Sequence, residues 1–256
     1  MTIKKFIFFV LVTFGFITPS NAQDRGITVV TGDDYPPITS RDLDDGGLAT
    51  KVVLRAFKIS NTHVNEIKWM PWARGISLTE ANKIDVAFPW GKTKERDPLF
   101  YYSDPIYPMI NYGYVSATAS MPFTKKEDLY GKTYCNPNGY GDFGIIKELF
   151  DKQLLLRQSP LNMMACFKML NLGRVDFVVS SKSDAEFAIK ESGLNHEAFK
   201  REDFELARTP LGILVSKKNK RGPQIIAAFN KGLKALTETG ELRQIYDQFH
   251  FDDYLD

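Results

Sequence analysis

Residues 83–107 read KIDVAFPWGKTKERDPLFYYSDPIY and hold the strongest indications of the fold. The apolar run at 85–90 predicts a β-strand, and a stretch with helical periodicity at 73–81 precedes it. The predicted strand ends at Gly91, and Arg96 follows shortly after it. Ligands of open α/β sheets bind beyond the carboxyl ends of the strands. We therefore expect a binding site where this strand ends.

On both sides of this stretch, short β-type runs alternate with runs of helical periodicity. Further strands are predicted at residues 26–31, 111–116, 132–135, 175–180 and 211–216. Further helices are predicted at residues 48–57, 143–152, 161–172, 183–191 and 222–239, with a last one from Gly240 to about Phe249. This alternation predicts an α/β fold of two units, each with a mostly parallel sheet, and the run at 111–116 as a strand that crosses between them.

Composition excludes several classes of protein. The 256 residues are 43% hydrophobic and 25% charged, which is typical of a globular protein and excludes disordered, collagen-like and disulfide-dense chains. Lys4 and Lys5 are the only charged residues in the first 22, so 31 basic and 31 acidic residues balance beyond them. A nucleic-acid-binding protein needs an excess of basic residues, and we expect no such partner.

The first 22 residues have the pattern of a secretory signal sequence. Lys4 and Lys5 precede an apolar run at 6–17, and small residues at 20–22 form a predicted cleavage site. The alternative is a membrane anchor, but the apolar run would rise only about 18 Å as a helix against a hydrocarbon core of about 30 Å. No cysteine near the cleavage site could carry a lipid. We expect a cleaved, unanchored protein in the periplasm.

Export changes the interpretation of the two cysteines, Cys135 and Cys166. In an oxidising compartment they are expected to form a disulfide bond. The alternative is a pair of buried thiols that act as small apolar residues. A catalytic thiol is disfavoured, since no histidine partner can be argued from the sequence.

Patterns typical of enzymes and metal sites are largely missing. His63, His196 and His250 lie far apart, with no helical pair and no cysteine at ligand spacing. The segments GKT at 91–93 and 131–133 resemble the end of a phosphate-binding loop but lack its first glycine. We therefore expect neither a metal ion nor a cofactor, and no feature calls for catalysis.

Aromatic residues recur at the predicted strand ends of both units. They could be ordinary core residues, but their recurrence favours a ligand site with flat apolar walls. An arginine among them could hold a carboxylate through two parallel hydrogen bonds. The aromatic residues in these positions are Tyr35, Trp72, Trp90 and Tyr140.

These motifs together resemble the bacterial periplasmic solute-binding proteins of family 3, the polar amino-acid type of ABC transporter. The combination of Thr93 and Arg96 with the segment SDPIY at 103–107 is the most specific part. The other matching segments are TGDDYPP at 31–37, KIDVAF at 83–88, GKTY at 131–134, MLNLGRVD at 169–176 and the end of the chain at 233–249.

The resemblance implies the type II periplasmic-binding-protein fold, in which two α/β lobes joined by two hinge strands close on a ligand. The segment 1–22, with its signal-sequence pattern, is expected to precede both lobes as a signal peptide. Lobe one is expected to comprise residues 23–113 plus 210–256, and lobe two residues 114–209.

The resemblance also implies roles for single residues. Arg96 matches the arginine that binds the ligand carboxylate, rather than pairing with Glu95 or Asp97. Gly91 matches a residue whose backbone N–H faces the same carboxylate. Tyr35 and Trp72 match lobe-one residues that pack on the ligand side chain. Tyr140 and Gly141 match lobe-two residues that complete the carboxylate cage.

Two departures from the family pattern concern the ligand. Pro89 stands where many members have a hydroxyl residue, and Ser181 stands where an acid normally holds the ligand ammonium. A buried ammonium without a counter-charge is costly. Either Asp184 or Asp142 supplies the acid, or the ligand is not a standard α-amino acid.

The expected function is therefore capture of a small carboxylate-bearing solute by a monomer that delivers it to an ABC permease. Two alternatives stay open. One is a dehydratase-like enzyme on the same scaffold, with Asp184 or Asp142 as acid or base. The other is a sensory protein that presents its closed form to a receptor.

Overall fold

The computed structural model describes residues 26–119 and 123–251, so the predicted signal sequence lies outside the described residues. The strands are β1 (Ile27–Thr31), β2 (Val64–Trp69), β3 (Val86–Gly91), β4 (Phe100–Tyr102), β5 (Tyr107–Ser116), β6 (Thr133–Cys135), β7 (Leu156–Gln158), β8 (Phe177–Ser180) and β9 (Phe199–Ser216). The α-helices are α1 (Leu48–Ile59), α2 (Trp72–Glu80), α3 (Gly144–Asp151), α4 (Met163–Asn171), α5 (Lys182–Glu191), α6 (Gly222–Glu238) and α7 (Glu241–Gln248). Three short 3₁₀ helices complete the described elements: η1 (Asp44–Gly46), η2 (Lys126–Leu129) and η3 (His196–Ala198).

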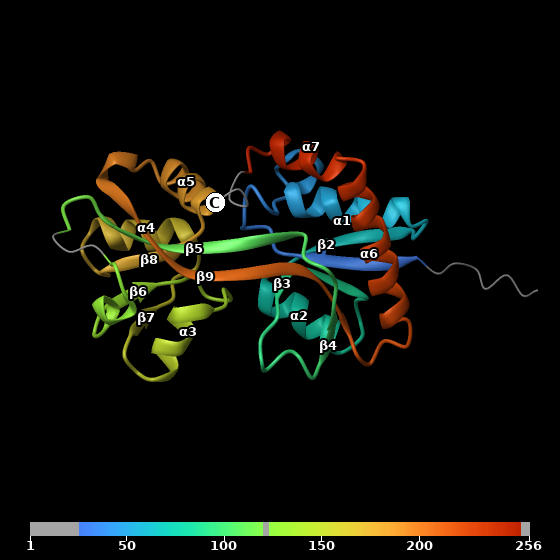
Figure 1. Cartoon of the computed structure of the whole chain (residues 1–256), viewed down its shortest axis with the longest axis horizontal. Coiled ribbons are helices and arrows are strands. Elements are labelled where there is room, and N and C mark those ends of the chain that lie inside the picture. The colour runs from blue at the N-terminus through green and yellow to red at the C-terminus, as the bar shows by residue number, and fades with distance from the viewer. Residues whose placement is uncertain (1–25, 120–122, 252–256) are drawn as a thin grey trace, which may run out of the picture.

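One mixed sheet runs through the whole molecule in the order β2-β1-β3-β9-β5-β8-β6-β7, with β4 added on β9. The strands at each end of this order pair in parallel, as the alternation of strands and helices predicts. The long strands β5 and β9 pair antiparallel in the middle, from Tyr107 opposite Leu211 to Ser116 opposite Phe199. Figure 1 shows these two strands as the connection between two halves.

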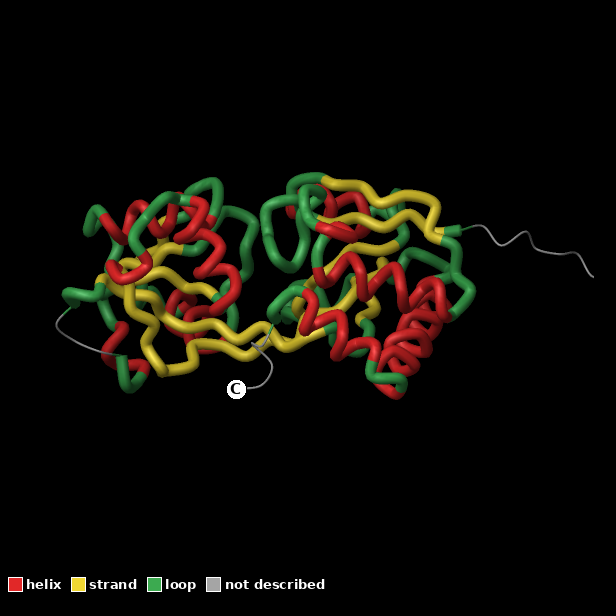
Figure 2. The backbone as a smooth tube through the Cα atoms, turned by 90° about the horizontal axis from the view of Figure 1, so that it is seen from above, coloured by secondary structure: helices red, strands yellow, loops and turns green. Residues whose placement is uncertain are grey.

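The two halves are lobes with separate hydrophobic cores (Figure 2). We call the half that contains β1–β4, α1, α2, α6 and α7 lobe 1, and the half that contains β6–β8 and α3–α5 lobe 2. Lobe 1 has one large core, with α1 and α7 on one side of its sheet and α2 on the other (Figure 1). Lobe 2 has two smaller cores, one formed with α4 and α5 and the other with α3.

Helix α1 shows how the sequence pattern produces this packing. Its predicted apolar face is buried, and Phe57 packs against Phe229 of α6 with ring centroids 5.5 Å apart. The two helices approach so closely that a Cβ at Gly232 would lie 1.9 Å from the carbonyl oxygen of Ala56. Only glycine fits at this contact.

Several strands were not predicted from the sequence. β2, β4 and β7 were not expected, and β9 begins at Phe199 rather than at 211. β2 and β7 are the outermost strands of the sheet and carry mostly half-exposed or exposed side chains, so they lack the apolar run that indicates a buried strand. The first half of β9, FKREDFELAR, was not predicted because charged residues interrupt its apolar pattern.

The predicted disulfide bond between Cys135 and Cys166 is confirmed. Both side chains are fully buried. The bond ties the carboxyl end of β6 to α4, whose first turn is capped by the Asn162 side chain, which accepts a hydrogen bond from the Ala165 N–H. Helix capping also explains why α4 begins later than the apolar run alone predicts.

No helix in the described segments has both the length and the apolar character needed to cross a membrane.

Candidate functional site

A cavity of about 80 Å³ lies between the lobes, beyond the carboxyl ends of β1, β3, β6 and β8. Lobe 1 contributes Tyr35, Trp72, Pro89, Trp90, Gly91 and Arg96 to its lining. The connecting strands β5 and β9 contribute Met109, Asn111 and Leu211. Lobe 2 contributes Asn136, Gly139, Tyr140, Gly141, Phe143, Met163, Val179, Ser180, Ser181 and Asp184.

Nine of the residues that the sequence suggested for ligand binding line this cavity. These residues come from distant parts of the chain, and the topology of the sheet brings them to a common edge. They are Tyr35, Trp72, Trp90, Gly91, Arg96, Tyr140, Gly141, Ser181 and Asp184.

Arg96 is held by its neighbours in lobe 1. Its guanidinium lies 4.5 Å from the centroid of the Trp90 ring, and Nη1 donates a hydrogen bond to the carbonyl oxygen of Gly91 over 3.3 Å. Burial lowers the pKa of Arg96, although an arginine stays charged at neutral pH. Burial of the neighbouring Tyr102 raises the pKa of its hydroxyl to about 12, although the Arg96 charge opposes this rise. The arginine is thus a partly dehydrated cation at the edge of the cavity.

The alternative role of Arg96, a surface ion pair, does not occur among the described residues. Glu95 pairs with Lys147 at 4.0 Å, and Asp97 pairs with Lys92 at 2.7 Å. No described carboxylate lies within ion-pair distance of Arg96. Its remaining N–H donors can therefore serve an anion in the cavity.

The aromatic residues form a continuous wall of edge-to-face contacts. Ring centroids are 6.3 Å apart for Tyr35 and Trp72, 5.7 Å for Trp72 and Trp90, and 5.6 Å for Tyr35 and Tyr140. Trp72 is fixed by its indole N–H, which donates to a carboxylate oxygen of Asp34 over 2.7 Å. Burial raises the pKa of Asp34, while this hydrogen bond opposes the rise.

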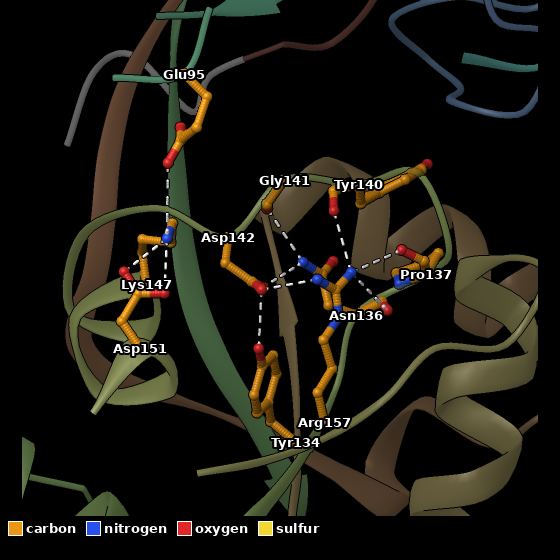
Figure 3. Close-up of polar contacts among 10 residues, drawn as sticks. All are labelled: Glu95, Tyr134, Asn136, Pro137, Tyr140, Gly141, Asp142, Lys147, Asp151 and Arg157. Carbon is orange, nitrogen blue, oxygen red and sulfur yellow. Dashed lines mark hydrogen bonds and ion pairs between the residues drawn. The ribbon is translucent and has the colours of Figure 1, made fainter. Parts of the chain in front are cut away.

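Polar contacts also join the two lobes. The Tyr140 hydroxyl donates to the main-chain oxygen of Asp34 over 3.2 Å. Glu95 of lobe 1 forms an ion pair with Lys147 of α3, which Figure 3 shows. The described conformation is therefore one in which the lobes touch.

The structure separates the two candidate acids, Asp184 and Asp142. Asp184 lies in the first turn of α5, is buried, and lines the cavity. Burial, with the Asp184 charge as the next contribution, raises the pKa of Tyr140 well above its usual value. Asp142 does not line the cavity and instead pairs with Arg157 at 2.7 Å. Of the two, only Asp184 can face a ligand in the described conformation.

Ser181 owes its place to helix capping. Its hydroxyl oxygen accepts a hydrogen bond from the Asp184 N–H, and it therefore caps α5. An acid, Asp184, thus lies one helical turn beyond Ser181. Neither residue alone would have revealed this relation in the sequence.

Sequence reasoning missed several lining residues. Asn111 and Met109 lie on β5, and Asn136 follows β6 directly. The signal for Asn111 was a polar residue inside an otherwise apolar and aromatic strand, where burial of an amide needs a reason. Ser180, at the end of β8, has a buried hydroxyl without a hydrogen-bond partner among the described residues, so a ligand could supply one.

Metal-binding chemistry has no support in the described segments, where no three His, Cys, Asp or Glu side chains converge as ligands. The polar groups that line the cavity are instead hydroxyl, amide, guanidinium and carboxylate groups. Such a set suits a small polar organic molecule.

Solved structures with a similar fold include periplasmic-type binding proteins and a sensor domain. A histidine kinase sensor domain with similarity to periplasmic binding proteins has a TM-score of 0.73 and 20% identity over 88% of this chain and 96% of its own. An ancestral arginine-binding protein bound to arginine has a TM-score of 0.73 and 24% identity over 88% and 99%. A putative L-cystine ABC transporter protein from Listeria monocytogenes has a TM-score of 0.71 and 19% identity over 90% and 97%. At these identities the similarity shows the fold, which is the two-lobed type II periplasmic-binding-protein fold.

A sequence search of the curated proteins returned no match. Residues 27–252 match the family model described as bacterial extracellular solute-binding proteins, family 3. This match spans both lobes and the strands that connect them. The chain belongs to family 3 of the bacterial extracellular solute-binding proteins.

Proposed function

We propose that the chain captures a small carboxylate-bearing solute, an amino acid or a derivative of one, and delivers it to an ABC permease. The observation that carries this proposal is the position of Arg96. Its guanidinium is partly buried beside the cavity and has no carboxylate partner among the described residues. A carboxylate is the group that a planar guanidinium binds best, through two parallel hydrogen bonds.

Lobe 2 is expected to complete the carboxylate site. The Gly91 carbonyl oxygen accepts a hydrogen bond from Arg96, and a Cβ at Gly91 would lie 2.7 Å from the Thr209 side chain and 3.1 Å from the Phe143 ring of lobe 2. The close packing therefore favours glycine at this position of the cavity wall. Ligand binding would favour the conformation with touching lobes, because only that conformation offers contacts from both.

Asp184 is expected to determine whether the ligand is also a cation. Among the described residues it is the one acid that lines the cavity, and it lies on the side that lobe 2 provides. A ligand with an amino group could add an ion pair with this carboxylate, which favours a zwitterion.

With this function we expect a signal peptide followed by two lobes. Residues 1–22 would direct export to the periplasm and be removed. Lobe one would comprise residues 23–113 plus 210–256 and lobe two residues 114–209, with the chain crossing twice through β5 and β9. We expect a monomer, since each cavity is formed within a single chain.

A sensory role is the second candidate function, because one of the similar solved structures is a histidine kinase sensor domain. Transport and sensing use the same closure and differ in the partner. Co-purification with a permease would support transport, whereas co-purification with a receptor kinase would support sensing. A dehydratase-like activity would appear as conversion of the solute, and we expect the solute to be recovered unchanged.

The direct test is a thermal-shift screen of the mature chain against amino acids, small organic acids and amines. A solute that binds the folded protein raises its melting temperature by mass action. We expect the stabilising compounds to share a carboxylate. Stabilisation by amines without any carboxylate would contradict the proposal.

A further inference from the structure

The segment 136–142 supplies much of the wall that lobe 2 contributes to the cavity. It connects β6 to α3 and has no regular secondary structure. Four of its residues line the cavity: Asn136, Gly139, Tyr140 and Gly141. A segment of this kind needs side-chain contacts to hold a single conformation, because it has few backbone hydrogen bonds of its own.

Arg157, on the edge strand β7, provides these contacts from outside the cavity. Its Nη1 donates to the carboxylate of Asp142 over 2.7 Å. Its Nη2 donates to the main-chain oxygens of Pro137 and Tyr140, each over 3.1 Å, and of Asn136 over 3.3 Å. Figure 3 shows the guanidinium surrounded by the segment.

The contacts form a connected network in a largely buried site. The Asp142 side chain is only 5% exposed and the Arg157 side chain 20% exposed, so both charges depend on one another. Asn136 donates to the Asp142 carboxylate over 2.9 Å and to the Gly141 oxygen over 3.1 Å. The Tyr134 hydroxyl donates to Asp142 over 2.9 Å, and burial together with the Asp142 charge raises the pKa of Tyr134.

We infer that Arg157 is a positioning residue of the solute site: it holds the segment 136–142 in the conformation that presents Tyr140 and Gly141 to the cavity. Its fork of N–H donors is what allows one side chain to bind a carboxylate and three carbonyl groups at once. The role of Arg157 in solute binding rests on the proposed function, whereas its role in ordering segment 136–142 does not.

The same contacts affect the closing of the lobes. The Tyr140 main-chain oxygen is held by Arg157, while the Tyr140 hydroxyl reaches the main-chain oxygen of Asp34 in lobe 1. A disordered segment would have to become ordered before it could make this contact. Arg157 therefore removes a conformational cost that would otherwise weaken solute binding.

Hydrogen-exchange mass spectrometry on the ligand-free mature chain tests the inference without knowledge of the solute. The variants are Arg157→Gln, Asp142→Asn with Arg157→Gln, and Arg55→Gln as the matched control. Arg55 makes a bidentate ion pair with Glu241 in lobe 1, away from the cavity. We expect the amides of Asn138 and Tyr140, which donate to Pro160 and Pro137, to exchange about tenfold faster in both Arg157 variants.

The double variant separates positioning from charge compensation. If Arg157 only neutralised the buried Asp142, the double variant would restore wild-type exchange as well as the melting temperature. Positioning predicts that the melting temperature recovers in the double variant while exchange in segment 136–142 stays fast. Wild-type exchange of this segment in either Arg157 variant would overturn the inference, and so would an equal increase in Arg55→Gln. A flat solute screen would count against the proposed function but would leave this result unaffected.

Discussion

The hydroxyl group of Tyr140 donates a hydrogen bond across the cavity to the main-chain oxygen of Asp34, over 3.2 Å. This contact joins lobe 2 to lobe 1, and the Tyr140 ring also contacts Tyr35 of lobe 1, with their ring centroids 5.6 Å apart. It exists only while the lobes touch. The contact therefore stabilises the conformation in which the lobes touch.

Tyr140→Phe should weaken solute binding without affecting the fold. The variant keeps the ring but loses the hydrogen bond to Asp34, so affinity should fall about threefold to tenfold, with the loss in the dissociation rate. Stopped-flow fluorescence with a solute from the screen measures both rates. The control is Tyr130→Phe, at an exposed position of lobe 2. Equal rates in the two variants would show that the contact has no part in closure.

Asp184→Asn should discriminate between ligand classes. If the solute carries a cation that faces Asp184, loss of this buried charge should reduce affinity by about thirtyfold or more. Binding of an analogue without the amino group should improve or stay the same. Calorimetric titration of both compounds makes the comparison, with Glu186→Gln on the exposed side of α5 as the control. A uniform loss for both compounds would indicate a structural role for Asp184.

Removal of the disulfide bond should destabilise lobe 2. The bond between Cys135 and Cys166 closes a loop with a sequence separation of 31, which corresponds to about 3.5 kcal/mol in the chain-entropy model. Chemical unfolding of the Cys135→Ser, Cys166→Ser double variant measures this difference. The mass of the exported wild-type protein without reductant should be two hydrogens lower than after reduction. Equal masses would show two free thiols and contradict the structure.

Asp34→Asn should change how stability depends on pH. Burial raises the pKa of Asp34 in the folded protein above 3.8, so folding favours its protonated form. This contribution is present in full below pH 3.8 and is lost as the pH rises through the folded pKa, so Asp34 costs stability at neutral pH. The asparagine retains an acceptor for the Trp72 N–H. Its free energy of unfolding relative to wild type should therefore rise with pH between acid and neutral conditions. A difference that is independent of pH would contradict the raised pKa.

The sequence predicted the core strands and the ligand cavity because both depend on short apolar runs and on the residues that follow them. β3 is such a run, and Gly91 and Arg96 follow it at the edge of the cavity. The edge strands β2 and β7 were missed because their side chains are not buried in a regular pattern.

The choice between Asp142 and Asp184 could not be made from the sequence, because it depends on contacts through space. Asp142 pairs with Arg157, which is fifteen positions away and lies on β7. Asp184 lines the cavity because Ser181 begins α5 at the end of β8. Neither arrangement leaves a periodic signal in the chain.

Calorimetric titration of Arg96→Ala with the best solute from the screen tests whether Arg96 binds the solute carboxylate. Arg74→Ala is the matched control, because Arg74 is exposed on α2 and does not line the cavity. We expect Arg96→Ala to keep the wild-type unfolding midpoint in the absence of solute but to show no detectable binding, while Arg74→Ala binds as the wild type does. Wild-type affinity in Arg96→Ala would contradict the assignment of Arg96 as the carboxylate-binding residue.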